Sequence, residues 1–533
     1  MISTDVCRQC RHLPEYSLNQ WRALCPPFCL KTLFPREAAL AATRREHDFL
    51  GELEIPADVY YGIQTCRAVE NFRISGMAIS SFPRFVQAFG YVKKAAAMAN
   101  MRLGVLPESI GKYICLACDR VIAGEFTNQF PVDVYQGGAG TSCNMNANEV
   151  IANVALEMMG RSKGEYQFCH PNNHVNCSQS TNDAYPTAMR MALYATLTDF
   201  MDDMEYLKDG FALKAEEFRN VLKMGRTQMQ DAVPMTLGME FAAWAATIAE
   251  DIRRIGEGRI QISDINMGAT AIGTGINTPE GYAPLVTEIL ARISGLPLVM
   301  AENLVEATFD AGAYVQISGL LKRFVVKLSK ICNDLRLLSS GPCCGLNEIN
   351  LPPRQPGSSI MPGKVNPVIP EVVNQVCFDV IGRDVTISMA AEAGQLELNA
   401  MEPVIAYSLF SSISHLGRAC RTLRDLCING ITANADHCLH MMKNAIGLVT
   451  ALTPYIGYER AAMIAREAKD NGMSVYDLVV QMEFMTPEEM NEVLSPERML
   501  RPGENKALQE KIAGRFSRSL HLDHSCSSMH SAR

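Results

Sequence analysis

The sequence predicts a mainly α-helical protein built from several domains. Apolar residues recur at three- and four-residue spacing over long stretches, as at Met189, Ala192 and Phe200. Strand signals are scarce, with short candidates only at residues 54–55 and 60–61. A chain of 533 residues exceeds the usual size of one domain, so two to four domains with a large core are expected.

The helical pattern occupies four stretches, at about residues 84–125, 186–260, 311–340 and 368–393. Segments rich in Gly and Pro separate them, and these segments also hold most of the clustered hydroxyl and amide side chains. We therefore expect the chemistry to lie on the connections between long helices.

Both ends of the chain have a different composition. Residues 1–43 mix Cys, Pro, Arg and Leu without periodicity, which predicts a poorly ordered extension, and residues 502–533 are rich in Ser, His and Arg, which predicts a disordered tail. Two other interpretations of the extension stay open. Its arginines admit organelle targeting, which three local acids weaken, and four cysteines admit a zinc site without any other zinc-finger cue. These cysteines are Cys7, Cys10, Cys25 and Cys29.

Composition excludes several classes of partner. The net charge of −8 argues against nucleic acid or an anionic membrane as the main partner. No uncharged apolar run reaches the ~18 residues of a membrane span. The 18 cysteines stand in a chain without an apparent secretion signal, so we expect reduced thiols and a cytoplasmic location.

Residues 357–367 form the most informative segment. This segment is predicted to be a mobile loop with a limited set of backbone conformations. Glycine at 357 and 363 allows conformations closed to other residues, and proline at 362 and 367 restricts them. Ser358 and Ser359 offer hydroxyls, Lys364 a compact positive charge and Asn366 an amide. This set of groups suits a small carboxylate substrate.

The same segment resembles the GSSxMPxKxNP signature of the aspartase/fumarase superfamily, whose members add or eliminate a group across a fumarate-type double bond. The resemblance continues at residues 129–142, 178–183, 225–228 and 268–275, and it covers about Arg44 to the neighbourhood of Arg501. It implies an N-terminal domain at 44–183, a central helical bundle at 184–435 that carries the loop, and a small helical domain at 436–501. It also implies a homotetramer with a shared multi-helix core and active sites built from different subunits.

The resemblance assigns roles residue by residue. Ser358 corresponds to the base that removes a proton beside a carboxylate, while Lys364 and Asn366, assisted by Ser359, bind the other carboxylate. The remaining substrate-binding positions are Thr141, Ser180, Thr181, Asn182, Thr227 and Gln228. The segment at 180–183 also reads as a helix N-cap. No organic cofactor and no metal ligand are expected, and activation by a divalent metal is left open.

Three features favour elimination of ammonia from L-aspartate to give fumarate. Residues 134–142 match the form found in ammonia-lyases, and residues 338–352 and 427–434 match as well. Gln228 stands where fumarases carry a histidine that partners a glutamate, and glutamine cannot titrate although Glu371 remains. The alternatives are a fumarate hydratase, an inactive scaffold, and an ammonia-lyase whose tails bind a protein partner. Asn173 replaces an aspartate of the family at an accessory anion segment, which leaves regulation there undetermined.

Overall fold

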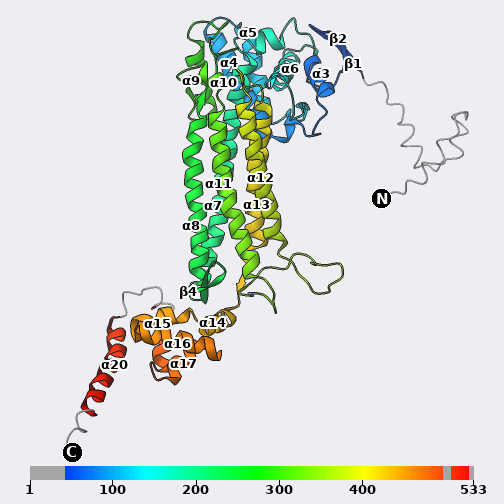
Figure 1. Cartoon of the computed structure of the whole chain (residues 1–533). Helices are drawn as coiled ribbons and strands as arrows, with labels where there is room; N and C mark the ends of the chain where they lie inside the picture. Colours follow the sequence, from blue (N-terminus) through cyan, green and yellow to red (C-terminus); the bar gives the residue numbers. More distant parts are fainter. Residues whose placement is uncertain (1–41, 496–497, 499–505, 527–533) are drawn as a thin grey trace, which may run out of the picture.

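Five long helices run side by side through the middle of the molecule (Figure 1). The computed structural model describes residues 42–495, 498 and 506–526. The long helices are α7 (Thr181–Glu217), α8 (Leu237–Arg259), α11 (Gly312–Leu338), α12 (Val368–Glu392) and α13 (Glu402–Leu426). This arrangement confirms the mainly helical fold class, and the helices predicted at 311–340 and 368–393 are α11 and α12.

A group of shorter elements covers one end of the bundle, at the top of Figure 1. They are β1 (Thr43–Asp48), β2 (Gly51–Pro56), α3 (Ile63–Asn71), η2 (Ile79–Ser81), α4 (Pro83–Arg102), α5 (Glu108–Ile122), η3 (Thr127–Gln129), α6 (Thr141–Met158), the π-helical turn η4 (Pro171–Val175), η5 (Ile260–Ile262), β5 (Asp264–Ile265), α9 (Tyr282–Ser294), β6 (Val299–Met300) and α10 (Glu306–Phe309). β1 and β2 pair antiparallel, and β5 and β6 pair parallel.

The opposite end carries two small antiparallel pairs and a cluster of short helices. The elements are β3 (Leu222–Thr227), β4 (Gln230–Thr236), β7 (Ile349–Asn350), η6 (Ile428–Gly430), β8 (Thr432–Ala433), α14 (Ala435–Asn444), α15 (Leu448–Ile456), α16 (Tyr458–Asn471), α17 (Val475–Gln481), α18 (Pro487–Val493) and α20 (Lys506–Cys526). None of the helices in the described part of the chain has an apolar stretch long enough to span a bilayer.

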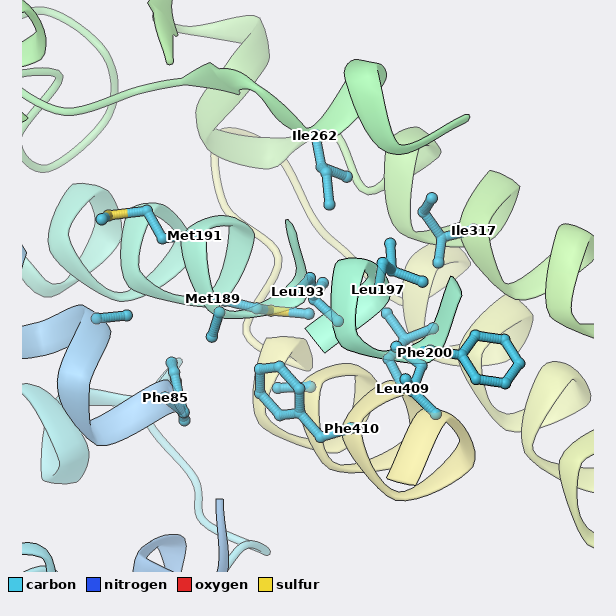
Figure 2. Packing of buried hydrophobic residues seen from close by; sticks show 14 of the residues in the cluster. Phe85, Met189, Met191, Leu193, Leu197, Phe200, Ile262, Ile317, Leu409 and Phe410 are labelled. Carbon is cyan, nitrogen blue, oxygen red and sulfur yellow. The ribbon is translucent and has the colours of Figure 1, made fainter. Parts of the chain in front are cut away.

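Helix α7 is the longest helix of the bundle and packs against α4, α8 and α13. Its residues Leu193, Leu197 and Phe200 follow helical spacing and are at most 1% exposed. Figure 2 shows them next to Leu409 and Phe410 of α13, which are also buried. Each such side chain contributes about 1.5–3 kcal/mol by leaving water, so this core holds α7 straight between the two ends of the molecule.

The central part of the stretch at 186–260 contradicts the helical prediction. Residues 222–236 form the β3–β4 hairpin between α7 and α8. Gly225 and Pro234 both disfavour helix, and the chain reverses here to place α8 antiparallel to α7. The strand candidate at 54–55 lies in β2, whereas the one at 60–61 is wrong: Tyr60 lies in an irregular segment and packs on Phe126.

The C-terminal helices have a hydrophobic core of their own. Met442, Leu452 and Val479 are fully buried in it, and Met224 from β3 joins them. The domain limits at 43, 183, 435 and 501 stay predictions. The limit at 183 falls inside α7, and the limit at 435 coincides with the first residue of α14. The predicted extension lies outside the described residues except for its last two.

Helix α20 corrects the prediction of a disordered tail. Leu508, Ile512 and Phe516 recur every four residues and face the C-terminal core, where α20 packs on α15. Arg515 also forms a two-pronged ion pair with the buried Glu489, with N–O distances of 2.6 and 2.8 Å. The Ser, His and Arg content of the segment hid this apolar stripe. The rest of the predicted tail lies outside the described residues.

Truncating the stripe tests this correction. Ile512→Ala removes a side chain that is 0% exposed and should destabilise the C-terminal helices by about 2–4 kcal/mol because it leaves a cavity. Urea unfolding followed by circular dichroism measures this loss. Glu510→Ala, on the exposed face of the same helix, is the control. Equal midpoints for the two variants would contradict the docking of α20.

Candidate active site

The N-terminal ends of α6 and α7 meet at the upper end of the bundle. Gly140, the N-cap of α6, has a φ of +90°, and a Cβ there would stand 2.2 Å from the ring of Tyr185 in α7. Thr141 is exposed, and its hydroxyl donates to the carbonyl of Gly138 at 2.8 Å. Thr181 begins α7 and is 8% exposed. Two helix N-termini side by side favour a bound anion because the positive ends of both helix dipoles lie there.

Asp183 fixes the predicted substrate-binding segment at the start of α7. Its carboxylate accepts from the Ser180 N–H at 2.9 Å, and the Ser180 hydroxyl accepts from the Asn182 N–H at 3.3 Å, which confirms the predicted N-cap. The second carboxylate oxygen accepts from the N–H groups of Gly268 and Thr270 at 3.1 and 3.0 Å. Burial raises the pKa of Asp183 to about 6, against the effect of these N–H donors. The carboxylate thus ties residues 180–183 to the loop at 268–270.

Pro186, the sixth residue of α7, removes one helical hydrogen bond near the start of the helix. Proline has no N–H, so the carbonyl of Asn182 has no helical donor four residues later. The side chain of Asn266 donates to that carbonyl at 2.9 Å instead. The Asn182 amide in turn donates to the carbonyl of Ala271 at 2.8 Å. Long-range side-chain contacts therefore replace helical hydrogen bonds where the predicted substrate residues lie.

A buried lysine lies behind this segment. Lys93 of α4 is 0% exposed, and its Nζ donates to Asn144 Oδ1 at 2.5 Å, Asn176 Oδ1 at 3.0 Å and Gln179 Oε1 at 2.9 Å. Asn144 Nδ2 donates to the Thr181 hydroxyl oxygen at 3.2 Å. Burial lowers the pKa of Lys93 to about 7, which a neighbouring carboxylate opposes.

Thr227 and Gln228 lie at the other end of the molecule, at the tip of the β3–β4 hairpin. Thr227 pairs with Gln230, and the two residues between them, Gln228 and Met229, have φ values of +53° and +64°. Such a turn usually takes Asn-Gly, and a left-handed backbone costs a non-glycine residue about 1–2 kcal/mol. Strain of this kind is typical of functional positions, and here it leaves the side chains of Thr227 and Gln228 exposed at the tip of the hairpin.

Buried ion pairs hold the base of this hairpin. Glu348 is 0% exposed and lies between Lys223, at 2.7 Å, and Arg226, which also contacts it. Lys223 forms a second ion pair with Glu240 of α8 at 2.6 Å. Removing one partner from such a cluster leaves a buried charge alone, so the cluster fixes the hairpin against the segment that leads into the loop at 357–367.

Ser358 lies in an ordered turn of the loop at 357–367. Its Oγ accepts from the N–H groups of Ile360 and Met361 at 3.2 and 3.0 Å. Asn366 closes the loop, because its amide donates to the carbonyl of Gly357 at 2.8 Å and Gly357 N–H donates to the carbonyl of Lys364 at 2.7 Å. Two N–H groups aimed at Oγ favour a negatively charged oxygen there. Ser359 and Lys364 are exposed, and Ser358 and Lys364 line a surface hollow of about 410 Å³.

One copy of the chain does not bring the predicted site residues together. Thr141 and residues 180–182 lie at the upper end of the bundle, whereas Thr227, Gln228 and the loop lie at the lower end, beyond the far end of α7 (Figure 1). A 37-residue helix at 1.5 Å per residue is about 55 Å long. No movement of a loop closes that gap within one chain.

The sequence also matches known families. A family model described as Lyase matches residues 51–382, and a model described as Fumarase C C-terminus matches residues 448–501. This chain belongs to the fumarase/aspartase superfamily. Within this superfamily it is 58% identical to the aspartate ammonia-lyase of Helicobacter pylori over 459 residues, which cover 86% of this chain and 98% of the relative.

Solved structures of this superfamily agree with the fold. A fumarate lyase:delta crystallin from Brucella melitensis is 54% identical with a TM-score of 0.83, and the match covers 86% of this chain and 99% of that one. A class II fumarase from Schistosoma mansoni is 33% identical with a TM-score of 0.81, and the match covers 87% and 100%. The matches thus cover nearly the whole length of both solved chains.

Two features of the site concern metals and anions. In the described part of the chain, no cluster of three or more His, Cys, Asp or Glu side chains is arranged to hold a metal ion. In the accessory segment, His170 Nδ1 accepts from the N–H groups of Asn172 and Asn173 at 3.0 and 3.3 Å. Burial lowers the pKa of His170, so a neutral ring that accepts hydrogen bonds is favoured there.

Sequence reasoning missed the residues that support the site. Lys93, Asn144 and Glu348 were not predicted to have any role there. One signal was available: α6 carries four asparagines among mostly apolar residues, and all four are buried, which implies a polar network inside the core. These residues are Asn144, Asn146, Asn148 and Asn153.

The contact between α6 and α7 predicts a sharp difference between two glycines. Gly140→Ala should cost about 2–5 kcal/mol, because it combines a left-handed backbone with a clash against Tyr185. Gly138→Ala has a similar φ of +86°, but its new Cβ would meet nothing closer than 3.9 Å, so about 1–2 kcal/mol is expected. Thermal unfolding of both variants measures the difference. Equal losses would refute the close packing of the two helix ends.

Proposed function

We propose that this chain is an ammonia-lyase that eliminates ammonia from L-aspartate to give fumarate. The observation that carries the proposal is Ser358, whose Oγ accepts two backbone N–H bonds inside a loop that also presents Lys364 and Asn366. Similarity to aspartate ammonia-lyases over nearly their whole length supports this choice of substrate.

Ser358 acts as the base in this proposal. A serine hydroxyl is a weak base, and removing its proton requires neighbouring groups that stabilise the alkoxide. The N–H groups of Ile360 and Met361 are two such groups, and the positive charge of Lys364 in the same loop is a third. The Ser358 alkoxide takes the Cβ proton of aspartate and becomes a hydroxyl, and the electrons of the C–H bond move into the adjacent carboxylate to give an enediolate dianion. Collapse of the dianion forms the double bond of fumarate and expels ammonia.

The other assigned residues hold the two carboxylates. Hydroxyl and amide donors at the upper end of the bundle receive the carboxylate on which charge develops, since preorganised donors stabilise such charge most effectively. These are Thr141, Ser180, Thr181 and Asn182. Lys364, Asn366 and Ser359 hold the second carboxylate. Thr227 and Gln228 line the site from the hairpin. The proposal needs no organic cofactor, and it places the enzyme in the cytoplasm.

Gln228 favours the lyase over fumarate hydratase, the second candidate. Hydration requires activation of water, which a titratable histidine–glutamate pair supports. Gln228 cannot carry a proton between two groups, whatever its distance from Glu371. The similarity to a class II fumarase at 33% identity concerns the shared fold and is well below the 58% found for an aspartate ammonia-lyase.

Each active site is shared between subunits in this proposal. The upper cluster and the loop stand about 55 Å apart in one chain, so a second copy supplies the missing half. Exposed apolar side chains on the long helices support assembly through the bundle, because a contiguous apolar face is stable only when covered. They include Val326 of α11 and Phe378, Val385 and Met389 of α12. A homotetramer of the kind the superfamily implies would bury them.

The first experiment measures fumarate by ultraviolet absorbance with L-aspartate or L-malate as substrate. We expect turnover of L-aspartate alone, and turnover of L-malate alone would establish the hydratase instead. Ser358→Ala should lower kcat by about a thousandfold while leaving the assembled protein intact. Ser339→Ala, a half-buried serine at the same end of the bundle, is the matched control. A kcat near that of the control would remove Ser358 from the base role.

Mixing two strongly impaired variants tests the shared site. Ser358→Ala damages the loop and Thr181→Val damages the upper cluster. Co-assembled in equal amounts, they should recover about one quarter of the wild-type sites, because loop and cluster come from different copies. Each variant assembled alone sets the background rate. A mixture that stays at background would mean that one chain contributes both halves.

A further inference from the structure

The hydrogen bonds of Lys93 match its ammonium form and orient its neighbours. Its Nζ donates to three different oxygens, from Asn144, Asn176 and Gln179, at 2.5 to 3.0 Å. A neutral amine has only two N–H bonds, so three acceptors match the ammonium form. All three acceptors are neutral amides. The carboxylate of Asp183 lies nearby, but its oxygens accept from backbone N–H groups at residues 180, 268 and 270.

An ammonium group can only donate, so it forces the amide of Asn144 to turn its Oδ1 inward. The Nδ2 of that amide then faces the other way, toward Asn176 Oδ1 at 3.1 Å and Thr181 Oγ1 at 3.2 Å. The Thr181 oxygen therefore receives a hydrogen bond from the protein. Its own hydroxyl proton stays available to a group outside the network, on the side where the substrate carboxylate is proposed to bind.

We propose that Lys93, acting through Asn144, is a positioning residue that directs the hydroxyl proton of Thr181 toward the substrate carboxylate on which negative charge develops. The inference rests on the proposed function, since it assigns a supporting residue to that same site. The chain Lys93–Asn144–Thr181 also carries the polarisation of a buried positive charge to the hydroxyl, which makes it a stronger donor.

If the network only stabilised the fold, the loss of activity would not depend on which asparagine stops donating a hydrogen bond. Asn148 offers the comparison, because it lies one helical turn along α6, is equally buried and also donates to Asn176 Oδ1, at 3.1 Å. No contact joins Asn148 to Thr181 among the described hydrogen bonds. A carboxylate at 144 or at 148 therefore puts the same charge into the same network, and only the one at 144 removes the donor to Thr181.

The test compares Asn144→Asp with Asn148→Asp. A carboxylate at 144 accepts from Lys93 as before, but it cannot donate to Thr181, so the Thr181 hydroxyl turns inward and donates to it. We expect kcat and kcat/KM for L-aspartate to fall together, by about a hundredfold, because the lost contact acts mainly in the transition state. Asn148→Asp should change kcat/KM by less than about threefold beyond any loss of folded protein.

The decisive readout is Asn144→Asp in a Thr181→Val background. If the effect passes through the Thr181 hydroxyl, Asn144→Asp lowers kcat/KM no further once that hydroxyl is gone. A further hundredfold loss in that background, or equal losses for the 144 and 148 variants, would overturn the inference while wild-type turnover keeps the proposed function intact. No turnover of L-aspartate by the wild type, or full activity of Thr181→Val, would overturn the proposed function or its site, and this inference with it.

Discussion

The length of α7 is the constraint on which the rest of this structure depends. The helix runs for 37 residues through a core of fully buried side chains, and the substrate segment precedes its second turn while the β3–β4 hairpin follows its last. A helix held on several sides by α4, α8 and α13 cannot bend to bring its ends together. Each end therefore carries half of the proposed chemistry, and the halves can meet only between copies. In the proposed assembly, the exposed apolar side chains of α11 and α12 lie at the interface between copies.

Much of the fold could be predicted from the sequence. The apolar periodicity of long helices is visible in the sequence, so the ends of α11 and α12 are predicted to within about two residues. The β3–β4 hairpin and α20 were not, for opposite reasons. The hairpin sits between two strong helical patterns that hide it, and its strained turn of Gln228 and Met229 lacks the usual Asn-Gly signal. In α20 the core-facing residues Leu508, Ile512 and Phe516 are separated by mostly polar residues, and this polar composition predicted disorder.

The site could be predicted in its residue types but not in its arrangement. The motifs named Ser358 and Thr181, and the structure adds what surrounds them: two N–H groups on the serine oxygen and an amide that donates to the threonine. Such contacts join residues far apart in the chain, such as Lys93 and Gln179, and no local pattern encodes them. The assignment of each residue to catalysis or binding stays a prediction from the superfamily resemblance.

The proline in the first turns of α7 has a consequence for the order of folding. Pro186 removes the N–H that would have donated to the carbonyl of Asn182. Extending an already nucleated α7 back to its first turn therefore forms one helical hydrogen bond fewer and is less favourable there. The carbonyl of Asn182 instead accepts a hydrogen bond from Asn266, more than eighty residues later in the chain. Closing so long a loop costs conformational entropy, and local contacts do not offset this cost. The proposed substrate-binding segment should therefore become ordered late, after α8 has returned along the bundle and brought the loop at 266–271 into place.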